Sequence, residues 1–468
     1  MVFASPIFLF IFLPLVIICN LLLSIQKNIL LNNICLLIFS IAFYACGSLE
    51  FLPILLASIL VNYVFSYLIY NAKNTYQKKI FLFFAVAFNV GLLFVYKYFN
   101  LFSSVLTGGK FVTNIILPIG ISFYTFQVIS YVVDVYRGDV KHCSNIINFS
   151  LFAMFFAQLI AGPIVRYKTI EENIKDRTVT LDNFSEGVRR FMIGFTKKII
   201  FANALGRVTD SALSWLSYYA MGKTLTVLVV VCYSMQIYLD FSAYSDMAVG
   251  IGKMFGFTFN ENFNMPFISK SITEFWKRWH ISLSSFFRDY VYIPLGGSKK
   301  GLFRTCINLT IVFALSGFWH GASFNFLFWG FYNAFFIVIE RILKTKFKIN
   351  IPGTIGILYV FIVWNVGMVF FRLESFNEVK LLFEGFISEP IYNQNIRYLL
   401  SLIYNPYFLF IFILSVLYLT PVYTMIREVL SRLKGGYIII DIVIVTLFIY
   451  SVLEMLTTGY NPFIYFRF

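Results

Sequence analysis

The sequence has little charge and very little histidine. Charged side chains make up 13% of its 468 residues, and only three residues are histidine. A soluble domain carries about 25% charged residues, so the composition excludes an ordinary soluble enzyme. The six cysteines form no CxxC pair. Zinc sites and disulfide frameworks that depend on such spacing are therefore not supported.

Long hydrophobic runs take the place of charge. Hydrophobic residues make up 59% of the chain and aromatic residues 20%, and the mean hydropathy is +0.80. About 20 apolar residues in a helix cross a hydrocarbon core of ~30 Å. We therefore predict an all-α polytopic membrane protein. About twelve spans are expected, near residues 5–24, 29–46, 52–70, 80–98, 115–133, 191–210, 222–240, 304–319, 322–340, 353–372, 402–420 and 438–457.

The positive charge of the chain is spread over its loops. The formal net charge is +15, but the Lys and Arg residues gather on no single soluble segment, so we expect no nucleic-acid partner. Retention of basic loops on the cytoplasmic side explains the charge better. The basic loops are residues 71–79, 166–190, 253–304, 341–348 and 427–434. This pattern predicts a multi-pass protein whose N-terminus lies outside, with the first run kept as a span rather than removed as a signal peptide.

Three stretches interrupt the simple pattern of spans. Residues 147–165 are apolar but lie between basic loops, which favours a re-entrant hairpin buried in protein. Residues 116–135 contain Pro118 and Gly120, which predict a broken or kinked helix. Residues 240–300 are too polar to cross a membrane. This stretch also contains the residue pattern that is most distinctive of a chemical function.

Residues 271–298, SITEFWKRWHISLSSFFRDYVYIPLGGS, predict one basic, aromatic helix at the membrane interface from Ile272 to about Tyr290. Glu274 and Arg278 are spaced for an i,i+4 ion pair. One face carries residues at i, i+3 and i+4 spacing, namely Thr273, Trp276, Lys277, His280 and Ser284. Basic side chains on such a helix suit an anionic substrate group and anionic lipid heads equally well.

Two histidines lie where water should be scarce. His280 follows a tryptophan in this segment, and His320 lies in the apolar stretch SGFWHGASFNFLFWG, residues 316–330. An ionisable side chain at membrane depth is costly and is by default a functional hypothesis. We expect Ser323 and Asn325 to orient the His320 ring. The third histidine, His142, is expected to be solvated in a basic loop.

Two aspartates in the stretch YLDFSAYSDMA are weaker candidates for chemistry. Asp240 and Asp246 are six residues apart, which puts them on different faces of a helix and argues against a shared acid/base pair. We expect each of them to pair with a Lys or Arg.

Several motifs together resemble the membrane-bound O-acyltransferase family (MBOAT), and most closely its subgroup that acetylates bacterial extracytoplasmic polysaccharides. The resemblance is strongest in FWKRWHISLSSFFRDYVYIPLGG (275–297) and the stretch at 316–330. It extends over LPIGISFYTFQVISYVVDVYRG (117–138), FAQLIAGPIVR (156–166), YLDFSAYSDMAVGIGKMFGF (238–257), FNENFNMPFISKSITEFW (259–276) and PFIYFRF (462–468).

The resemblance implies a fold and an activity. The implied fold is a single membrane domain over residues 1–468, with its catalytic motifs in about 116–340. It is a ring of about 11–12 transmembrane helices, with re-entrant and interfacial helices, around a central tunnel. The implied protein is a transferase of the bacterial inner membrane that takes acetyl from cytoplasmic acetyl-CoA. A periplasmic partner or a cell-envelope polysaccharide would accept the acetyl group, with no bound cofactor or metal.

The resemblance also assigns residues. His320 matches the catalytic histidine of the family's WHG-type motif, and His280 matches its second essential histidine. We expect His320 to act as the base, although an acyl-histidine intermediate stays open. From the two motifs and the helix face we expect substrate contacts from Trp276, Lys277, Arg278, Trp279, Ser284, Arg288, Trp319, Ser323 and Asn325.

Other functions compete with acetyl transfer. Peptidoglycan is our first choice of polymer, because abundant Ile, Phe, Lys and Asn are typical of AT-rich genomes; alginate or another exopolysaccharide comes next. Within the family, a D-alanyl transferase of teichoic acid with a carrier-protein thioester is the alternative. From other classes, a transporter or flippase would use His320 as a proton relay, and a structural scaffold would need neither histidine. The absence of an internal repeat disfavours transport.

Overall fold

A computed structural model describes residues 1–113, 115–160, 162–216, 221–349, 352–390 and 393–462. Within these residues the ordered elements are all helices and no strand occurs, which confirms the all-α class. Residues 463–468, and with them most of the closing motif that resembles the family, lie outside the described part.

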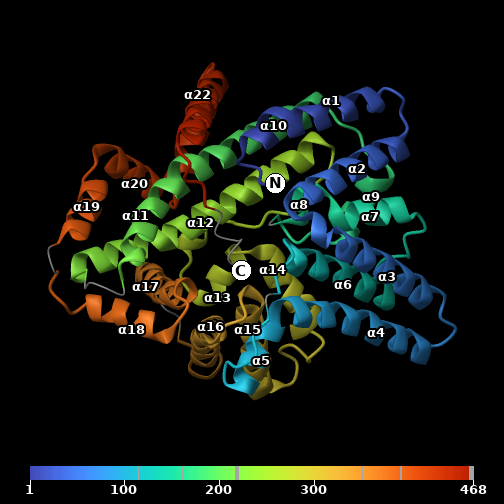
Figure 1. The fold of residues 1–468 in the computed structure, drawn as a ribbon, viewed down its shortest axis with the longest axis horizontal. Coiled ribbons are helices and arrows are strands. Elements are labelled where there is room, and N and C mark those ends of the chain that lie inside the picture. The colour runs from blue at the N-terminus through green and yellow to red at the C-terminus, as the bar shows by residue number, and fades with distance from the viewer. Residues whose placement is uncertain (114, 161, 217–220, 350–351, 391–392, 463–468) are drawn as a thin grey trace. The chain divides into compact units, whose positions relative to one another are not determined.

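The helices group into two compact units (Figure 1). Unit 1 comprises Met1–Phe191 and Tyr244–Glu261, and unit 2 comprises Met192–Ala243 and Asn262–Phe468. Helices α10 (Leu181–Thr196) and α12 (Lys223–Met254) contribute residues to both. The single domain expected over 1–468 stays a prediction, and each unit is described by itself.

Unit 1 contains nine helices in its N-terminal segment as far as the structure describes it: α1 (Leu13–Ser24), α2 (Ile29–Ser48), α3 (Leu52–Asn71), α4 (Thr75–Leu93), α5 (Phe99–Thr107), α6 (Ile121–Arg137), α7 (Ile146–Met154), α8 (Phe156–Leu159) and α9 (Tyr167–Lys175).

Unit 2 carries the later helices: α11 (Asn203–Ser214), α13 (Ile272–Arg278), α14 (Ile281–Phe287), α15 (Gly301–His320), α16 (Phe324–Ile342), α17 (Gly353–Arg372), α18 (Phe376–Gly385), α19 (Gln394–Ile403), α20 (Pro406–Tyr418), α21 (Val422–Arg432) and α22 (Gly436–Thr457).

Short irregular turns extend several of these helices. Leu49–Phe51 and Pro266–Ile268 form 3-10 turns, and π-helical turns occupy Phe8–Phe12, Phe94–Tyr98, Lys197–Ala202, Arg288–Tyr292 and Leu343–Phe347.

Seven helical stretches in the described residues are long and apolar enough to cross a membrane. They are Ile29–Asn71, Thr75–Thr107, Lys223–Met254, Gly301–His320, Phe324–Phe347, Gly353–Arg372 and Gly436–Thr457; α19 and α20, bent by 59° at their junction, make an eighth if they count as one broken span. The polytopic helical class is thus confirmed, but the number of spans is lower than the twelve predicted.

Breaks and charges within the apolar runs explain the difference. Residues 29–46 and 52–70, predicted as two spans, belong to one helical stretch, and the first run becomes a short helix over Phe8–Ser24. The predicted span at 191–210 changes to a π-helical turn at two lysines, Lys197 and Lys198. Hydropathy alone does not register such changes in backbone geometry.

Two of the interruptions that the sequence predicts in the pattern of spans are present in the structure. Gly120 has φ +75°, a conformation that favours glycine, and α6 begins only after it. In the described part of residues 147–165, helices α7 and α8 are both too short to span a membrane, the chain breaks between them at Phe155, and all four residues of α8 are buried. Irregular backbone of this kind is tolerated at membrane depth when it is buried in protein.

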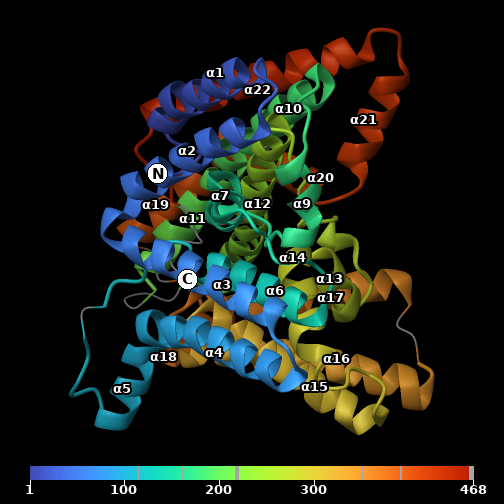
Figure 2. The same cartoon turned by 90° about the vertical axis from the view of Figure 1, so that its right-hand side faces the viewer.

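In unit 1, helices α3, α4 and α6 lie side by side (Figure 2). Their interface contains a reciprocal pair of amides, in which Asn62 Nδ2 donates to Asn89 Oδ1 at 3.1 Å and Asn89 Nδ2 donates to Asn62 Oδ1 at 2.7 Å. Both side chains are fully buried. Polar pairs of this kind hold helices together in lipid, where apolar surface alone supplies no driving force.

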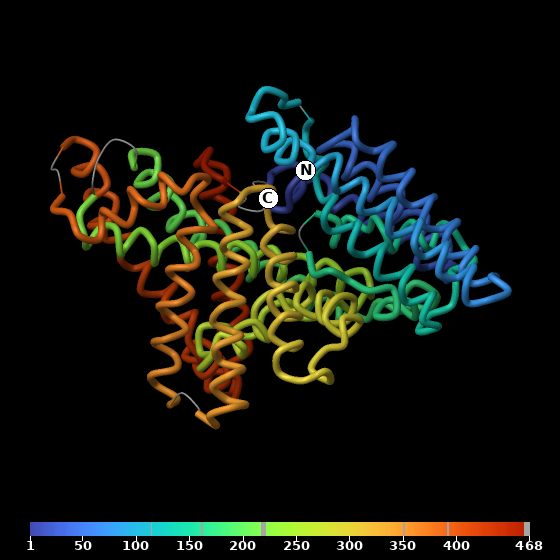
Figure 3. Tube along the Cα trace, turned by 90° about the horizontal axis from the view of Figure 1, so that it is seen from below, coloured from blue at the N-terminus to red at the C-terminus, as the bar shows by residue number. Residues whose placement is uncertain are grey.

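In unit 2, α15, α16 and α17 pack in sequence, and Figure 3 shows α16 and α17 as neighbouring gold-to-orange helices. Small residues allow the close approach of α15 and α16, since a Cβ on Gly330 would lie 2.4 Å from Phe313 O. An aromatic core with Trp276, Trp279, Trp329 and Trp364 fills the space beside them. Trp329 and Phe371 of this core pack against the ring of His320.

Candidate functional site

The structure brings His280 and His320 together inside unit 2. Their ring centroids are 6.4 Å apart, although 39 residues separate them in sequence. His280 is 0% exposed and His320 is 3% exposed. Two imidazoles this close, both shielded from water, form the centre of the candidate active site.

Aromatic rings enclose both histidines. Phe241 of α12 meets the His280 ring edge to face at 4.7 Å between centroids. Trp329 of α16 and Phe371 of α17 meet the His320 ring at 5.2 and 5.1 Å. Trp319 lies 5.9 Å from His280 and 4.9 Å from His320. The rings recorded around the two imidazoles are therefore aromatic side chains from three helices and the end of α15.

His280 stands at a break in the helix that the sequence predicts as continuous. Helix α13 ends at Arg278 and α14 begins at Ile281, because His280 has φ +45°. The prediction of one helix from Ile272 to Tyr290 is therefore wrong. A left-handed non-glycine residue costs about 1–2 kcal/mol, and such strain is typical of functional sites.

A neighbouring loop holds the break in place. Ile281 N donates to Asn262 O at 2.9 Å, and Ser282 Oγ donates to Asn262 Oδ1 at 2.8 Å. Asn264 N donates to Arg278 O at 2.9 Å. These bonds satisfy the backbone on both sides of His280 and fix the direction of its ring.

His320 is the last residue of α15, and the chain turns directly after it. Gly321 makes this turn possible, because a Cβ there would lie only 2.2 Å from the Phe326 ring. The carbonyl end of a helix carries partial negative charge and stabilises a cation placed on it. The position therefore suits an imidazole that gains a proton during a reaction.

A cavity of about 280 Å³ lies beside α15, the helix that ends at His320, although neither histidine lines it. Ser316 lines it and lies one helical turn before His320 on the same face of α15. Trp276 lines it too, and its ring lies 5.6 Å from Trp329, which in turn packs on His320. Trp276 thus connects the lining of the cavity to His320 indirectly, through Trp329.

Cationic side chains line the same cavity. Lys277 of α13, Arg288 and Arg341 come from three different elements and are all exposed. Hydroxyl groups of Thr273, Ser284, Tyr292 and Ser316 also line it. Cations at the exposed part and apolar rings at the buried part suit a ligand with an anionic head and an uncharged arm.

The cavity contains four of the predicted substrate contacts, Trp276, Lys277, Ser284 and Arg288. Trp319 lies between the two histidines instead. The other four predicted contacts, Arg278, Trp279, Ser323 and Asn325, are not among the residues that line it.

Those four side chains are held in other contacts. Arg278 forms the predicted ion pair with Glu274, at 2.9 Å. Trp279 packs on Trp364 at 4.5 Å, within the aromatic core. Ser323 Oγ accepts the Phe326 N–H and so caps α16. Asn325 Nδ2 donates to Leu373 O at 2.7 Å and ties α16 to the end of α17.

Three residues of α16 that contribute to the site were not predicted from the sequence. Asn333 Oδ1 accepts the Trp276 indole N–H at 3.2 Å. The Glu340 carboxylate accepts N–H groups of Ile272 at 2.6 Å and Thr273 at 2.9 Å, which anchors the start of α13. Arg341 adds a cation to the cavity. The only signal of these residues in the sequence was their polarity within an apolar run, and that signal did not indicate which residues they contact.

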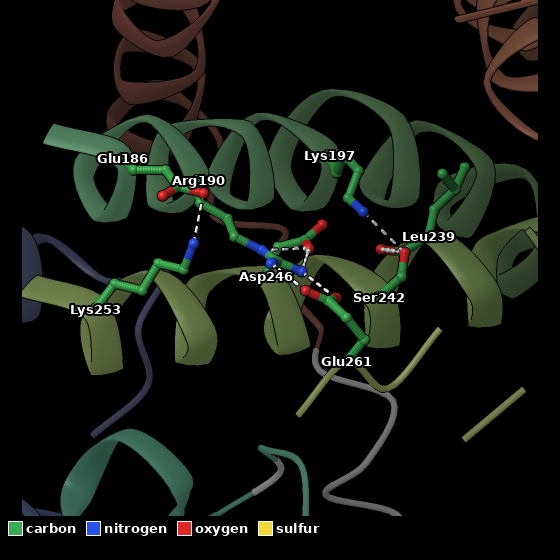
Figure 4. Close-up of polar contacts among 8 residues, drawn as sticks. All are labelled: Glu186, Arg190, Lys197, Leu239, Ser242, Asp246, Lys253 and Glu261. Carbon is green, nitrogen blue, oxygen red and sulfur yellow. Dashed lines mark hydrogen bonds and ion pairs between the residues drawn. The ribbon is translucent and has the colours of Figure 1, made fainter. Parts of the chain in front are cut away.

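The two aspartates of α12 form ion pairs, as predicted. In unit 1, Arg190 Nη2 lies 2.9 Å from Asp246 Oδ1 and also pairs with Glu261 (Figure 4). In unit 2, Asp240 Oδ1 lies 2.8 Å from Lys198 Nζ, and both side chains are buried. These pairs neutralise charge that would be costly at membrane depth.

His142 lies in unit 1, and the structure differs from the prediction that this histidine is solvated. It is half-buried, its Nδ1 lies 3.0 Å from Ser66 Oγ, and the rings of Tyr63 and Tyr67 lie 4.9 and 5.5 Å away. The sequence placed it in a basic loop but held no sign of the tyrosines around it. Among all described residues, no group of three His, Cys, Asp or Glu side chains is arranged to hold a metal ion.

The chain is similar to known proteins over the segment that contains this site. The model of the membrane-bound O-acyltransferase family matches residues 139–377, which include both histidines and all the residues that line the cavity. A probable alginate O-acetylase of Pseudomonas putida is 36% identical over all of both chains. One of Pseudomonas aeruginosa is 40% identical over 83% of this chain and 75% of its own. A peptidoglycan O-acetyltransferase of Helicobacter pylori is 31% identical over 83% and 80%.

The burial of His280 predicts a dependence of stability on pH. Burial lowers the pKa of His280 to about 3, from 6.5 for the free side chain. Between these values the unfolded chain binds a proton that the folded chain does not. Stability therefore falls as pH decreases through this window, by about 1.4 kcal/mol per pH unit at most.

The substitution His280→Asn tests this effect, because Asn tolerates positive φ and does not titrate. Thermal unfolding in detergent at pH 8 and pH 5 is the measurement. The wild type should lose roughly 2 kcal/mol more stability than the variant between the two pH values. Equal losses would mean that His280 titrates alike in the folded and unfolded chains.

Proposed function

Because the chain belongs to the membrane-bound O-acyltransferase family, and is thus an acyltransferase, we propose that it transfers acetyl from acetyl-CoA to a cell-envelope polysaccharide across a bacterial inner membrane. The observation that carries the proposal is the pair of buried histidines 6.4 Å apart, beside a cavity lined by three cations. Similarity to O-acetylases along the whole chain supports acetyl as the group transferred.

The cavity at Lys277, Arg288 and Arg341 is the proposed site for acetyl-CoA. The phosphates of coenzyme A would contact these cations, since guanidinium and ammonium groups form strong charge-assisted hydrogen bonds with phosphate. The uncharged thioester arm would extend past Trp276 and Ser316 toward His320. The positive-inside rule puts the loops that carry these cations on the cytoplasmic side, where acetyl-CoA is made.

His320 is the proposed base. It takes the proton of the acceptor hydroxyl while that oxygen attacks the acetyl carbonyl. The C–S bond then breaks, and the departing thiolate takes the proton back from the imidazolium. The carbonyl end of α15 favours the transient positive charge on His320. Each cycle leaves an acetyl ester, coenzyme A and an unchanged imidazole.

His280 is the proposed stabiliser of negative charge. Its low pKa keeps the ring neutral at physiological pH, and a neutral imidazole still has one N–H to donate. A donor held in place by the break after α13 would meet the oxyanion that develops on the acetyl carbonyl. This role would give a function to the strained left-handed backbone at His280.

The acceptor is the least determined part of the proposal. The relatives' names cover alginate and peptidoglycan, so we propose an extracytoplasmic polysaccharide, with peptidoglycan tested first. The acceptor hydroxyl belongs either to the polymer or to a periplasmic partner that completes the transfer. The alternatives predict other outcomes: a transporter needs a gradient, a D-alanyl transferase does not use acetyl-CoA, and a scaffold does not need His320.

The substitution His320→Ala tests the proposed base. Transfer of radiolabelled acetyl from acetyl-CoA in membrane vesicles, without an ion gradient, should fall by about 10²–10⁴-fold, the usual contribution of a general base. His142→Gln is the matched control, since it replaces the histidine of unit 1 and should keep wild-type transfer. Activity of His320→Ala within a few-fold of wild type, at equal amounts of folded protein, would refute the assignment.

The substitution Arg341→Gln tests the donor site. Loss of one phosphate contact should raise the KM for acetyl-CoA about tenfold, which corresponds to about 1.4 kcal/mol, with little change in kcat. Arg304→Gln removes an exposed charge of α15 that does not line the cavity, so its KM should stay unchanged. S-acetylpantetheine lacks the phosphates and should not distinguish Arg341→Gln from wild type. An equal rise with both donors would contradict a phosphate contact.

A further inference from the structure

Unit 2 contains a second cavity that the proposed reaction does not use. Its volume is about 300 Å³, and it is partly open to the surroundings. Its walls come from α20, α21, α22 and the region where α10 ends. The lining is overwhelmingly apolar, with residues such as Leu414, Leu417, Val443, Ile444 and Leu447. A cavity of this size lies at the lower end of the range for small-molecule sites, about 300–1,000 Å³.

The one buried charge in the wall has partners within the protein. Lys197 is buried, and its Nζ donates to Ser242 Oγ of α12 at 3.1 Å (Figure 4). The ring of Tyr418 lies 5.0 Å from the same nitrogen. The ammonium group is therefore bound by Ser242 and Tyr418. The interior of the cavity suits a hydrocarbon chain.

The exposed cation in the lining of the cavity is Arg427 of α21. Two further basic residues, Arg432 and Lys434, follow it in the sequence, and the acidic residues nearby are Glu428 and Asp441. Basic residues at the end of membrane-spanning helices attract anionic lipid headgroups.

Helix α21 itself has the character of a helix that lies on a membrane surface. Its apolar residues Met425, Ile426 and Val429 are all more than half exposed, although they are large and hydrophobic. Exposed apolar residues beside basic ones are the pattern of an interfacial helix. The two helices on either side of α21, α20 and α22, belong to candidate membrane spans. The cavity therefore opens where lipid headgroups and acyl chains meet.

We propose that this cavity binds one acyl chain of an anionic phospholipid, whose phosphate contacts Arg427. The apolar lining accounts for the chain, and the exposed arginine accounts for the charge of the headgroup. The proposal does not rest on acetyl transfer, because it involves neither the histidines nor the cavity at Lys277.

Photo-crosslinking tests the proposal on the full chain in phosphatidylcholine nanodiscs. The probe is phosphatidylglycerol with a diazirine in its acyl chain, and a phosphatidylcholine of the same design serves for comparison. Peptide mass spectrometry locates the adducts. We expect phosphatidylglycerol adducts concentrated on the residues that line the cavity, and about tenfold fewer in Arg427→Gln, the change that 1.4 kcal/mol of lost binding produces.

Two substitutions fill the cavity from different walls, Ile444→Trp on α22 and Leu414→Trp on α20. Each should reduce the cavity adducts by about tenfold, so a folding defect in one leaves the other as a test. Ile442→Trp is the matched control, because Ile442 is 60% exposed on α22 and does not line the cavity; its adducts should match wild type.

Three results would overturn the proposal. Adducts spread evenly over exposed residues such as Ile442 would show general lipid contact only. Cavity adducts that survive both filling variants would place the lipid elsewhere. Equal labelling of the cavity by phosphatidylcholine would contradict the role of the anionic headgroup and of Arg427.

Discussion

The site depends on keeping two imidazole rings out of water and next to each other. A buried histidine resists protonation, and this holds for His280, whose ring packs against Phe241 and Trp319. The rings of Trp329 and Phe371 pack against His320. In such buried surroundings a hydrogen bond or a developing charge is worth far more than in water. In the proposed reaction the two imidazoles are the groups that the acetyl thioester meets, and their different positions give them the different proposed roles.

Local features of the backbone hold the two histidines in this arrangement, and one of these features is strained. His280 adopts a left-handed backbone that costs free energy, and the loop at Asn262 and Asn264 stabilises it with backbone and side-chain hydrogen bonds. His320 ends a helix whose carbonyl groups favour positive charge, and the absence of a side chain at Gly321 lets the chain turn against Phe326. Asn333 and Glu340 connect α16 to α13. The cavity at Lys277 therefore keeps a fixed position relative to His320.

Much of this could be predicted from the sequence, and the rest could not for identifiable reasons. The length of the apolar runs predicted a helical membrane protein, and the motifs predicted both histidines of the candidate site. The i,i+4 spacing predicted the Glu274–Arg278 pair correctly, because helical neighbours follow from local geometry. The break at His280 was missed because the hydrogen bonds that stabilise it come from Asn262 and Asn264 in a separate loop. Arg341 was missed for the same reason: its place beside Lys277 is set by the packing of α16 on α13, which no local pattern encodes.

The most direct test of the account is the sidedness of the reaction. Inverted and right-side-out vesicles containing the protein would enclose a polysaccharide acceptor, with any periplasmic partner, and receive radiolabelled acetyl-CoA outside. The account predicts labelled acceptor inside inverted vesicles, whose outer face carries the basic loops, and none inside right-side-out vesicles. Label that appears only when acetyl-CoA and acceptor share one side of the membrane would contradict acetyl transfer across it.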